Sequence, residues 1–116
     1  MDELKDYVRR VKIGESTLRN EIFQFVDDFR LEKNVTPIEA EIGLVDYVDF
    51  LFAATAHQLC IEMGLRTPSW LHKPLSLSEP YFFSQLEGLK LLALRDSPGP
   101  FRARNIFVQK NFLDRA

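Results

Sequence analysis

Residues 36–65, which read TPIEAEIGLVDYVDFLFAATAHQLCIEMGL, decide the fold of this chain. Thr36 is a good N-cap, Pro37 suits the first helical position, and Glu39 completes a capping box. Gly64 at the other end is typical of a left-handed C-terminal cap. Between them, apolar residues recur at helical spacing: Ile38, Ile42, Val45, Val48, Leu51, Phe52, Leu59 and Met63. The pattern predicts one central helix of about 27 residues, about 40 Å long, that other elements must cover on several sides.

Two shorter helices are predicted before this stretch. Residues 2–12 have an apolar stripe at helical spacing, formed by Leu4, Tyr7, Val8 and Val11. Gly14 is expected to end that helix. Ser16 then caps a second helix, whose apolar residues are Leu18, Ile22, Phe25, Val26 and Phe29.

The part after the central helix is less regular. Pro68, Pro74 and Pro80 interrupt the segment from residue 64 to 81, which has no apolar period, and we expect Trp70 to attach it to the core. Ser84-Gln85-Leu86-Glu87 is a second capping box and predicts a helix through the apolar residues Leu86, Leu89, Leu92 and Ala93. Ser97-Pro98 predicts one or two further turns, and Ile106–Val108 is a short β-prone run.

These signals predict an all-α protein, a single compact domain over residues 1–116 with a long central helix, a Pro-rich irregular segment and a short C-terminal extended run. The contents of hydrophobic residues (46%) and of charged residues (28%) are those of a globular protein and argue against disorder. The helical half, residues 1–64, holds 13 acidic and 7 basic side chains, whereas residues 65–116 hold 4 acidic and 8 basic ones. We expect this charge asymmetry to hold the two halves together, ahead of steering a partner.

The sequence also predicts where the protein resides. A single cysteine, Cys60, excludes an internal disulfide and fits a reducing compartment. No apolar run approaches the roughly 18 residues of a membrane span, and the acidic N-terminus does not resemble a signal peptide. We therefore expect a cytoplasmic protein without membrane association.

Two groups of side chains are candidates for catalysis or for metal binding. His57 and Cys60 are three residues apart and share a helix face, but their apolar neighbours favour a packed pair over a nucleophile and base. Asp46, Asp49 and Glu41 lack the Glu-x-x-His partners of di-iron bundles, and we interpret them as a solvated acidic stripe. We expect no metal and no cofactor.

Arg66 and His72 are the weak candidates for catalysis. Their spacing resembles the Arg-x(4–6)-His pattern of helical HEPN-type ribonucleases, in which the arginine would hold a phosphate and the histidine would act as acid or base. A basic surface is the alternative route to nucleic acid, through Arg102, Arg104, Lys110, Arg115, Lys73, Lys90 and Arg95. An isoelectric point near 5.7 and the lack of a convincing helix-turn-helix pair disfavour that route.

Four short segments follow one another in a recognisable order: AHQLC at 56–60, GLRTPSW at 64–70, EPYF at 79–82 and SPGPFRARNIFV at 97–108. The order resembles a widespread group of bacterial and phage-associated small proteins, some of them antitoxin-like components. In others a similar module follows a helix-turn-helix domain of the XRE type, but nothing before residue 53 of this chain looks like such a domain. The resemblance covers roughly residues 53–116 and implies a module for protein recognition. The positions that match it are Trp70, Phe101, Arg102, Arg104, Asn105 and Phe107.

The residues of the C-terminal motif also have expected roles without the resemblance. Phe101 is expected to face the preceding helix, and one of Arg102 and Arg104 to pair with an acid of the central helix. Asn105 suits a left-handed turn. The run Ile106–Val108 would add to the strand edge of a partner or of a second copy, unless the whole motif closes the domain.

The sequence therefore predicts a non-enzymatic protein-interaction module, the antitoxin-like member of a two-component system. It leaves open whether the partner is another protein or a second copy. The alternatives are a small HEPN-like ribonuclease using Arg66 and His72, and an accessory protein that binds nucleic acid through the basic half.

Overall fold

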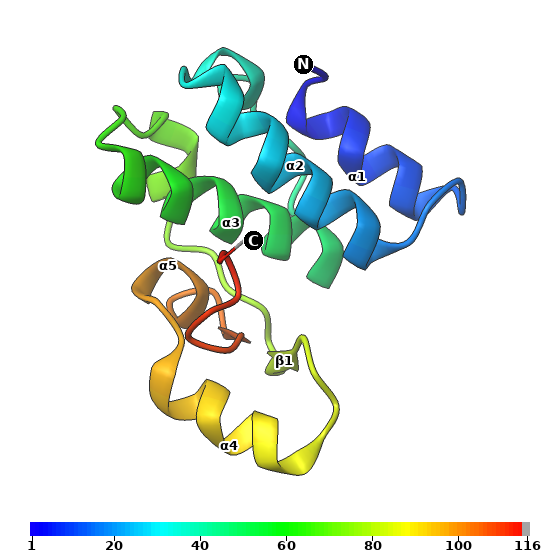
Figure 1. Ribbon diagram of the computed structural model, residues 1–116, viewed down its shortest axis with the longest axis vertical. Coiled ribbons are helices and arrows are strands. Elements are labelled where there is room, and N and C mark those ends of the chain that lie inside the picture. The colour runs from blue at the N-terminus through cyan, green and yellow to red at the C-terminus, as the bar shows by residue number, and fades with distance from the viewer. Residues whose placement is uncertain (115–116) are drawn as a thin grey trace.

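Three helices form one end of the molecule and a fourth lies at the other end (Figure 1). The structure is a computed structural model and describes residues 1–114. Its α-helices are α1 (Leu4–Lys12), α2 (Leu18–Glu32), α3 (Tyr47–Met63), α4 (Glu87–Asp96) and α5 (Gly99–Arg102). Two 3₁₀ turns, η1 (Thr36–Ile38) and η2 (Ser69–His72), and two short strands, β1 (Tyr81–Phe82) and β2 (Ile106–Phe107), complete the fold. The protein is thus a mostly helical globule, as predicted.

The two N-terminal helices lie close to their predicted positions. Helix α1 buries Leu4, Tyr7 and Val8, and Gly14 follows it with a φ of +80°. Helix α2 is capped by Thr17, one residue after the expected cap, because the Thr17 hydroxyl accepts a hydrogen bond from the backbone N–H of Asn20 at 3.1 Å. These helices are confirmed.

The central helix is shorter than predicted. Thr36 and Pro37 open only the 3₁₀ turn η1, and residues 39–46 form no helix. Helix α3 has 17 residues and begins at a capping box formed by Asp46 and Asp49. The Asp46 carboxylate accepts a hydrogen bond from the backbone N–H of Asp49, and the Asp49 carboxylate accepts one from the backbone N–H of Asp46 at 3.1 Å. Its C-terminal end is as expected, since Gly64 has a φ of +66°.

Helix α3 is the centre of the core. All residues from Val48 to Ala56 are buried, because α1, α2, α5 and η2 all pack against this helix. Aromatic rings fill the space between the N-terminal helices, with Phe25 5.4 Å from Tyr7, 5.6 Å from Phe29 and 6.1 Å from Phe52 between ring centroids. Each such buried ring contributes about 1.5–3 kcal/mol of apolar burial.

The C-terminal half returns to this core through β2. Strands β1 and β2 pair in parallel, with Tyr81 opposite Ile106 and Phe82 opposite Phe107. Ile106 and Val108 are buried. The β-prone run therefore pairs within its own chain, and its addition to the strand of a partner stays a prediction.

Two expected caps are also absent. Helix α4 begins after Leu86 with no side-chain cap, so the box at Ser84 does not form. Ser97 does not cap α5. Its hydroxyl instead donates to the carbonyl of Ala93 and accepts from the backbone N–H of Val108 at 2.9 Å, which joins the end of α4 to the residue after β2. None of the helices within residues 1–114 is long and apolar enough to cross a membrane.

Candidate functional site

Trp70 fixes the irregular segment after α3. Its side chain is only 6% exposed, and its indole N–H donates to the carbonyl of Ile38 at 2.9 Å. This bond joins η2 to η1, as the sequence analysis expected of Trp70. It also holds His72 and Lys73, which follow directly, beside α3.

Three aromatic or amide residues of the C-terminal motif serve the packing of the fold. Phe101 is fully buried on α5, which packs mainly against α3, whereas we expected it to face α4. Asn105 adopts the predicted left-handed conformation, with a φ of +62°, and its amide donates to the carbonyl of Leu77. Phe107 stacks on Phe82 across the strand pair at 5.2 Å between ring centroids.

The two arginines of the motif point to different places. Arg102 is exposed and donates through Nη2 to the carbonyls of Leu94 and Arg95, which caps the C-terminal end of α4. Arg104 is buried. The expectation that one of them pairs with an acid of the central helix is wrong, because the contact of Arg104 with α3 is to His57.

The guanidinium of Arg104 joins three parts of the chain. Nη1 donates to the carbonyl of Pro100 at 2.9 Å, and Nη2 donates to the carbonyl of Leu71 at 2.6 Å. Nη2 also lies 3.3 Å from Nδ1 of His57. Since a guanidinium only donates, Nδ1 accepts and the ring proton of His57 belongs on Nε2.

His57 is held neutral by its surroundings. Burial is the main cause that lowers its pKa, and the charges of Arg104 and His72 lower it further. The rings of His57 and His72 lie edge to face, 5.2 Å apart between centroids. Burial also lowers the pKa of Arg104.

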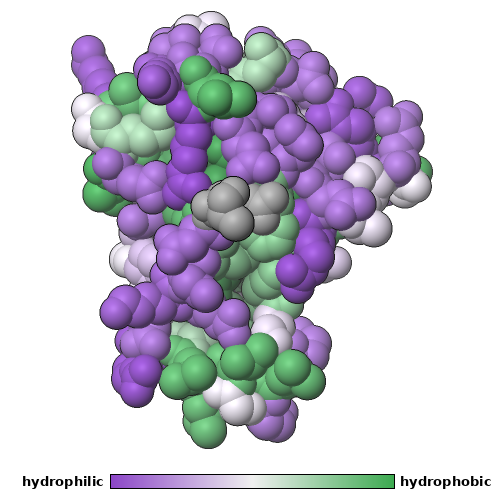
Figure 2. Space-filling view, in the orientation of Figure 1, coloured by the Kyte–Doolittle hydropathy of each residue, from purple (hydrophilic) through white to green (hydrophobic). Residues whose placement is uncertain are grey.

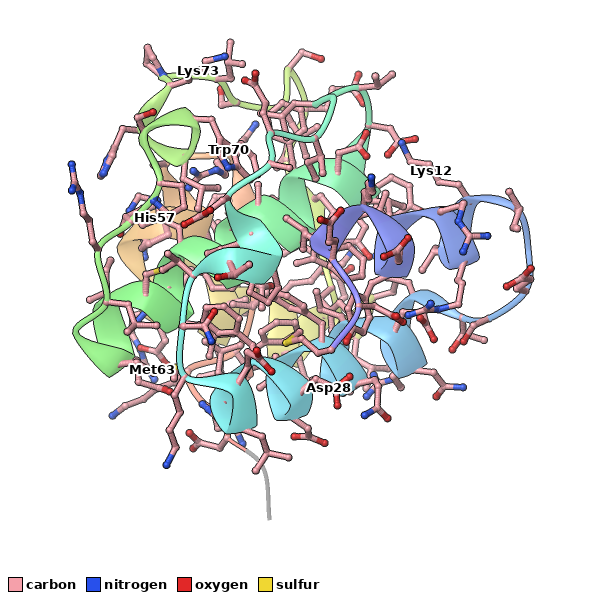
Figure 3. The ribbon with its side chains drawn as sticks, turned by 90° about the horizontal axis from the view of Figure 1, so that it is seen from above. Lys12, Asp28, His57, Met63, Trp70 and Lys73 are labelled. Carbon is pink, nitrogen blue, oxygen red and sulfur yellow. The ribbon has the colours of Figure 1, made fainter. Side chains whose placement is uncertain are left out.

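A hollow of about 360 Å³ lies beside these groups and is called the Arg104 pocket here. Figure 3 shows His57 and Lys73 on the same side of the molecule, with Lys12 on the other side. The residues that line the pocket are His57, Ile61, Leu71, His72, Lys73, Pro74, Leu75, Gly99, Pro100, Ala103 and Arg104. They include four side chains that carry or can gain positive charge and no carboxylate.

The two weak catalytic candidates, Arg66 and His72, line a second hollow of about 630 Å³, which also contains Glu39. Both side chains are exposed. The structure therefore brings them together, which weakens an interpretation as an interaction module alone. Arg66 nevertheless lies in the irregular segment between α3 and η2, whereas the ribonuclease pattern places its arginine at the start of a helix.

The other candidate groups are occupied by the fold. Cys60 is buried, and burial raises the pKa of its thiol, as expected for a packed residue. The interpretation of a solvated acidic stripe is wrong for Asp49, which is 2% exposed and bound to Lys12 at 2.7 Å. Glu41 forms an ion pair with Lys73. Within residues 1–114, no cluster of three acidic, histidine or cysteine residues is arranged to hold a metal.

The basic residues proposed for nucleic acid have different surroundings. Arg104 is buried, Arg102 caps α4, and Arg95 pairs with Asp96. Lys110 is exposed. Arg115 lies outside the described residues.

The surface of α4 carries apolar side chains that the sequence pattern did not predict to be exposed. Four leucines of this region are exposed: Leu86 at 68%, Leu91 at 70%, Leu92 at 42% and Leu94 at 44%. Only Ala93 of the helix is buried. Figure 2 shows these apolar side chains gathered over α4 at the end of the molecule away from α1 and α2. A signal existed in the sequence, because leucines at 91, 92 and 94 cannot all face one side of a helix.

Comparisons of the chain with protein-family models, curated proteins and solved structures found no match. The resemblance to antitoxin-like proteins therefore stays a prediction.

Proposed function

We propose that this chain is a non-enzymatic protein-interaction module whose binding element is the leucine surface of α4, formed by Leu86, Leu91, Leu92 and Leu94. The observation that carries the proposal is the exposure of Leu91, Leu92 and Leu94 around α4 and of Leu86 directly before it. Scattered exposed leucines are ordinary on protein surfaces, but a contiguous apolar patch is typical of an interaction site.

The charges beside the leucines favour a second copy of the chain as the occupant. Glu87, Leu91 and Arg95 are spaced four residues apart, so they lie along one face of α4. In an antiparallel pair of α4 helices centred on Leu91, Glu87 of one copy lies opposite Arg95 of the other. Both charged side chains are largely exposed, at 88% and 71%. The face is thus complementary to itself, as a two-fold interface requires.

Analytical ultracentrifugation of the full chain tests this arrangement. Because a contact between two helices of this length is at the small end of protein interfaces, we expect a weak dimer that forms with rising concentration. Leu91→Lys places two like charges at the two-fold axis and should leave a monomer. Leu31→Lys is the matched control, since Leu31 is 80% exposed on α2 and should not alter the dimer.

A charge exchange makes the test specific to the geometry. Glu87→Arg should weaken the dimer, and adding Arg95→Glu should restore it, because the two opposed charges are then only exchanged. A monomer at all accessible concentrations, or a dimer that Leu91→Lys does not change, would exclude the second copy as occupant.

The resemblance supports a more specific form, in which the module is the antitoxin-like member of a two-component system. The partner is then the product of the neighbouring gene. Co-purification of the two proteins should be lost with Leu91→Lys and kept with Leu31→Lys. If neither self-association nor this complex depends on Leu91, the proposed function is wrong.

A ribonuclease is the second candidate, because Arg66 and His72 are exposed in one hollow. The arginine would hold a phosphate of the RNA, and the histidine would transfer a proton. Cleavage of labelled RNA that disappears in His72→Ala and Arg66→Ala would establish this activity. Cleavage that persists in both variants, or none in the native protein, would remove it. Salt-dependent retention on nucleic acid without cleavage would instead favour an accessory protein that binds it.

A further inference from the structure

Arg104 is a buried cation without a carboxylate partner. It is 6% exposed, and its contacts within residues 1–114 are two backbone carbonyls and one neutral imidazole. These contacts use Nη1 once and Nη2 twice, so they leave Nε–H and one hydrogen of Nη1 without an acceptor among them. Buried charges in proteins are ordinarily paired with an opposite charge.

The groups around His57 provide no negative charge either. Arg104 faces it from the turn between α5 and β2, and His72 faces it from η2. On α3 itself, the residues one turn away are Ala53, Ala54, Ile61 and the buried thiol of Cys60, whose pKa burial raises, so none of them supplies a negative charge. Positive neighbours and burial together disfavour a proton on His57. An anion in the pocket would oppose this effect, since it would favour the charged form of His57.

Charge and apolar surface are both present in the Arg104 pocket. Lys73 adds a further cation at its rim, where it pairs with Glu41 on the outside. The remaining wall is mostly apolar and is formed by Ile61, Leu71, Pro74, Leu75, Pro100 and Ala103. A volume of about 360 Å³ lies at the lower end of the range of ligand pockets and exceeds what a bare oxyanion fills.

We propose that the Arg104 pocket binds a small phosphate monoester, with the phosphate against Arg104 and Lys73 and the organic group against the apolar wall. The charged Nε–H of Arg104 is left to donate to one phosphate oxygen, and the ammonium of Lys73 can donate to another. Two cations in one pocket, Arg104 and Lys73, favour a dianion over a carboxylate. The site is separate from the leucine surface of α4, so it does not depend on the proposed protein interaction.

Phenyl phosphate is a suitable probe because it joins the two features of the pocket. Isothermal titration of the full chain at low salt should show binding of phenyl phosphate that is tighter than binding of inorganic phosphate or of benzoate. The comparison with inorganic phosphate measures the contribution of the apolar wall to affinity, and the comparison with benzoate measures the preference for a dianion. The resonances of His57 and His72 followed by NMR should move, and the pKa of His57 should rise when the probe is bound.

Two variants assign the binding to this pocket. Lys73→Ala, at an exposed residue, should weaken phenyl phosphate binding on the order of 10-fold by loss of a charge-assisted bond. Arg104→Gln should weaken it by more, provided that circular dichroism shows a folded protein. Lys5→Ala is the matched control, because Lys5 is an exposed lysine on α1 outside this pocket.

The outcomes separate the ligand classes. Benzoate that binds as tightly as phenyl phosphate would overturn the preference for a phosphate, and inorganic phosphate that binds as tightly would overturn the role of the apolar wall. No binding of any of the three anions to the folded native chain would overturn the site. Binding that Lys73→Ala leaves unchanged, with no shift of the His57 and His72 resonances, would place the anion elsewhere and also contradict the proposal.

Discussion

Replacing Asp49 with alanine removes one acceptor that holds together three parts of the fold. Its Oδ2 accepts from the backbone N–H groups of Val45 at 2.9 Å and Asp46 at 3.1 Å. The same oxygen lies 2.7 Å from Nζ of Lys12, at the end of α1. The side chain of Asp49 is 2% exposed, whereas that of Lys12 is 35% exposed. Asp49 therefore joins α1, the segment before α3 and the first turn of α3.

The expected loss of stability follows from these partners. Removing one member of a buried ion pair costs about 3–5 kcal/mol, because the other charge is left without a partner. The lower part of this range applies here, since water reaches Lys12 and Asp46 stays 3.7 Å from its Nζ, while the two backbone donors lose their acceptor. We expect Asp49→Ala to lower the free energy of unfolding by about 3 kcal/mol and the melting temperature by about 10 °C.

Urea unfolding followed by circular dichroism measures this difference. Asp46→Ala is the matched control, because Asp46 caps the same helix but is 48% exposed and should cost only about 1 kcal/mol. In a Lys12→Met background, Asp49→Ala should cost about 1–2 kcal/mol less than in the native chain. Equal losses for Asp49→Ala and Asp46→Ala, or no coupling to Lys12, would refute the role given to this carboxylate.

Other perturbations test the same arrangement. Trp70→Phe keeps an aromatic ring in the core but leaves the carbonyl of Ile38 without its donor. Urea unfolding should therefore show a free energy of unfolding that is lower by about 1–3 kcal/mol. An unchanged midpoint would contradict the anchoring role of Trp70. The folded-state pKa of His57 lies below its unfolded value, so the unfolded chain binds more protons as the pH falls through about 6.5, and the free energy of unfolding should decrease there. His57→Gln should reduce this pH dependence in melting curves. An equal pH dependence in both proteins would contradict the role of His57. Cys60 should react with a thiol reagent far more slowly in the folded chain than in urea at pH 8, since it is buried and burial raises its pKa; equal rates would show that the site is open.

The central helix shows what periodicity predicts well and where it fails. The apolar spacing from Val48 to Met63 and the glycine at 64 correctly indicated a helix and its end. The start was misplaced because two capping boxes occur in the same stretch and both precede apolar residues. Two contacts favour the later start of the helix. Lys12 binds the carboxylate of Asp49, and the indole N–H of Trp70 donates to the carbonyl of Ile38. Both contacts are distant in sequence, so local pattern alone does not decide between the two boxes.

The leucines of α4 show a different limit. Apolar residues that recur at helical spacing usually mark the buried face of a helix. In this chain Leu86 and Leu92 are exposed, and only Ala93 is buried against the rest of the fold. Periodicity predicts that an apolar face will be covered, but it does not say by which chain. The same pattern thus fits a core helix and a helix that binds a second molecule.

Arg104 shows why the C-terminal motif was hard to interpret from sequence as either structural or functional. Its two carbonyl contacts join Leu71 to Pro100 and close the fold, which explains its burial. Closure alone does not require a charge, since a neutral donor also binds carbonyls. Arg104 is desolvated beside two imidazoles, and no acid lies among the residues that line its pocket. Its charge therefore makes the empty fold less stable than the fold with an anion in the pocket. Comparing Arg104→Gln with the native chain separates these roles: if Arg104 only closes the fold, the variant loses stability to the same extent with and without phenyl phosphate. If it also binds the anion, phenyl phosphate raises the melting temperature of the native chain and not that of the variant.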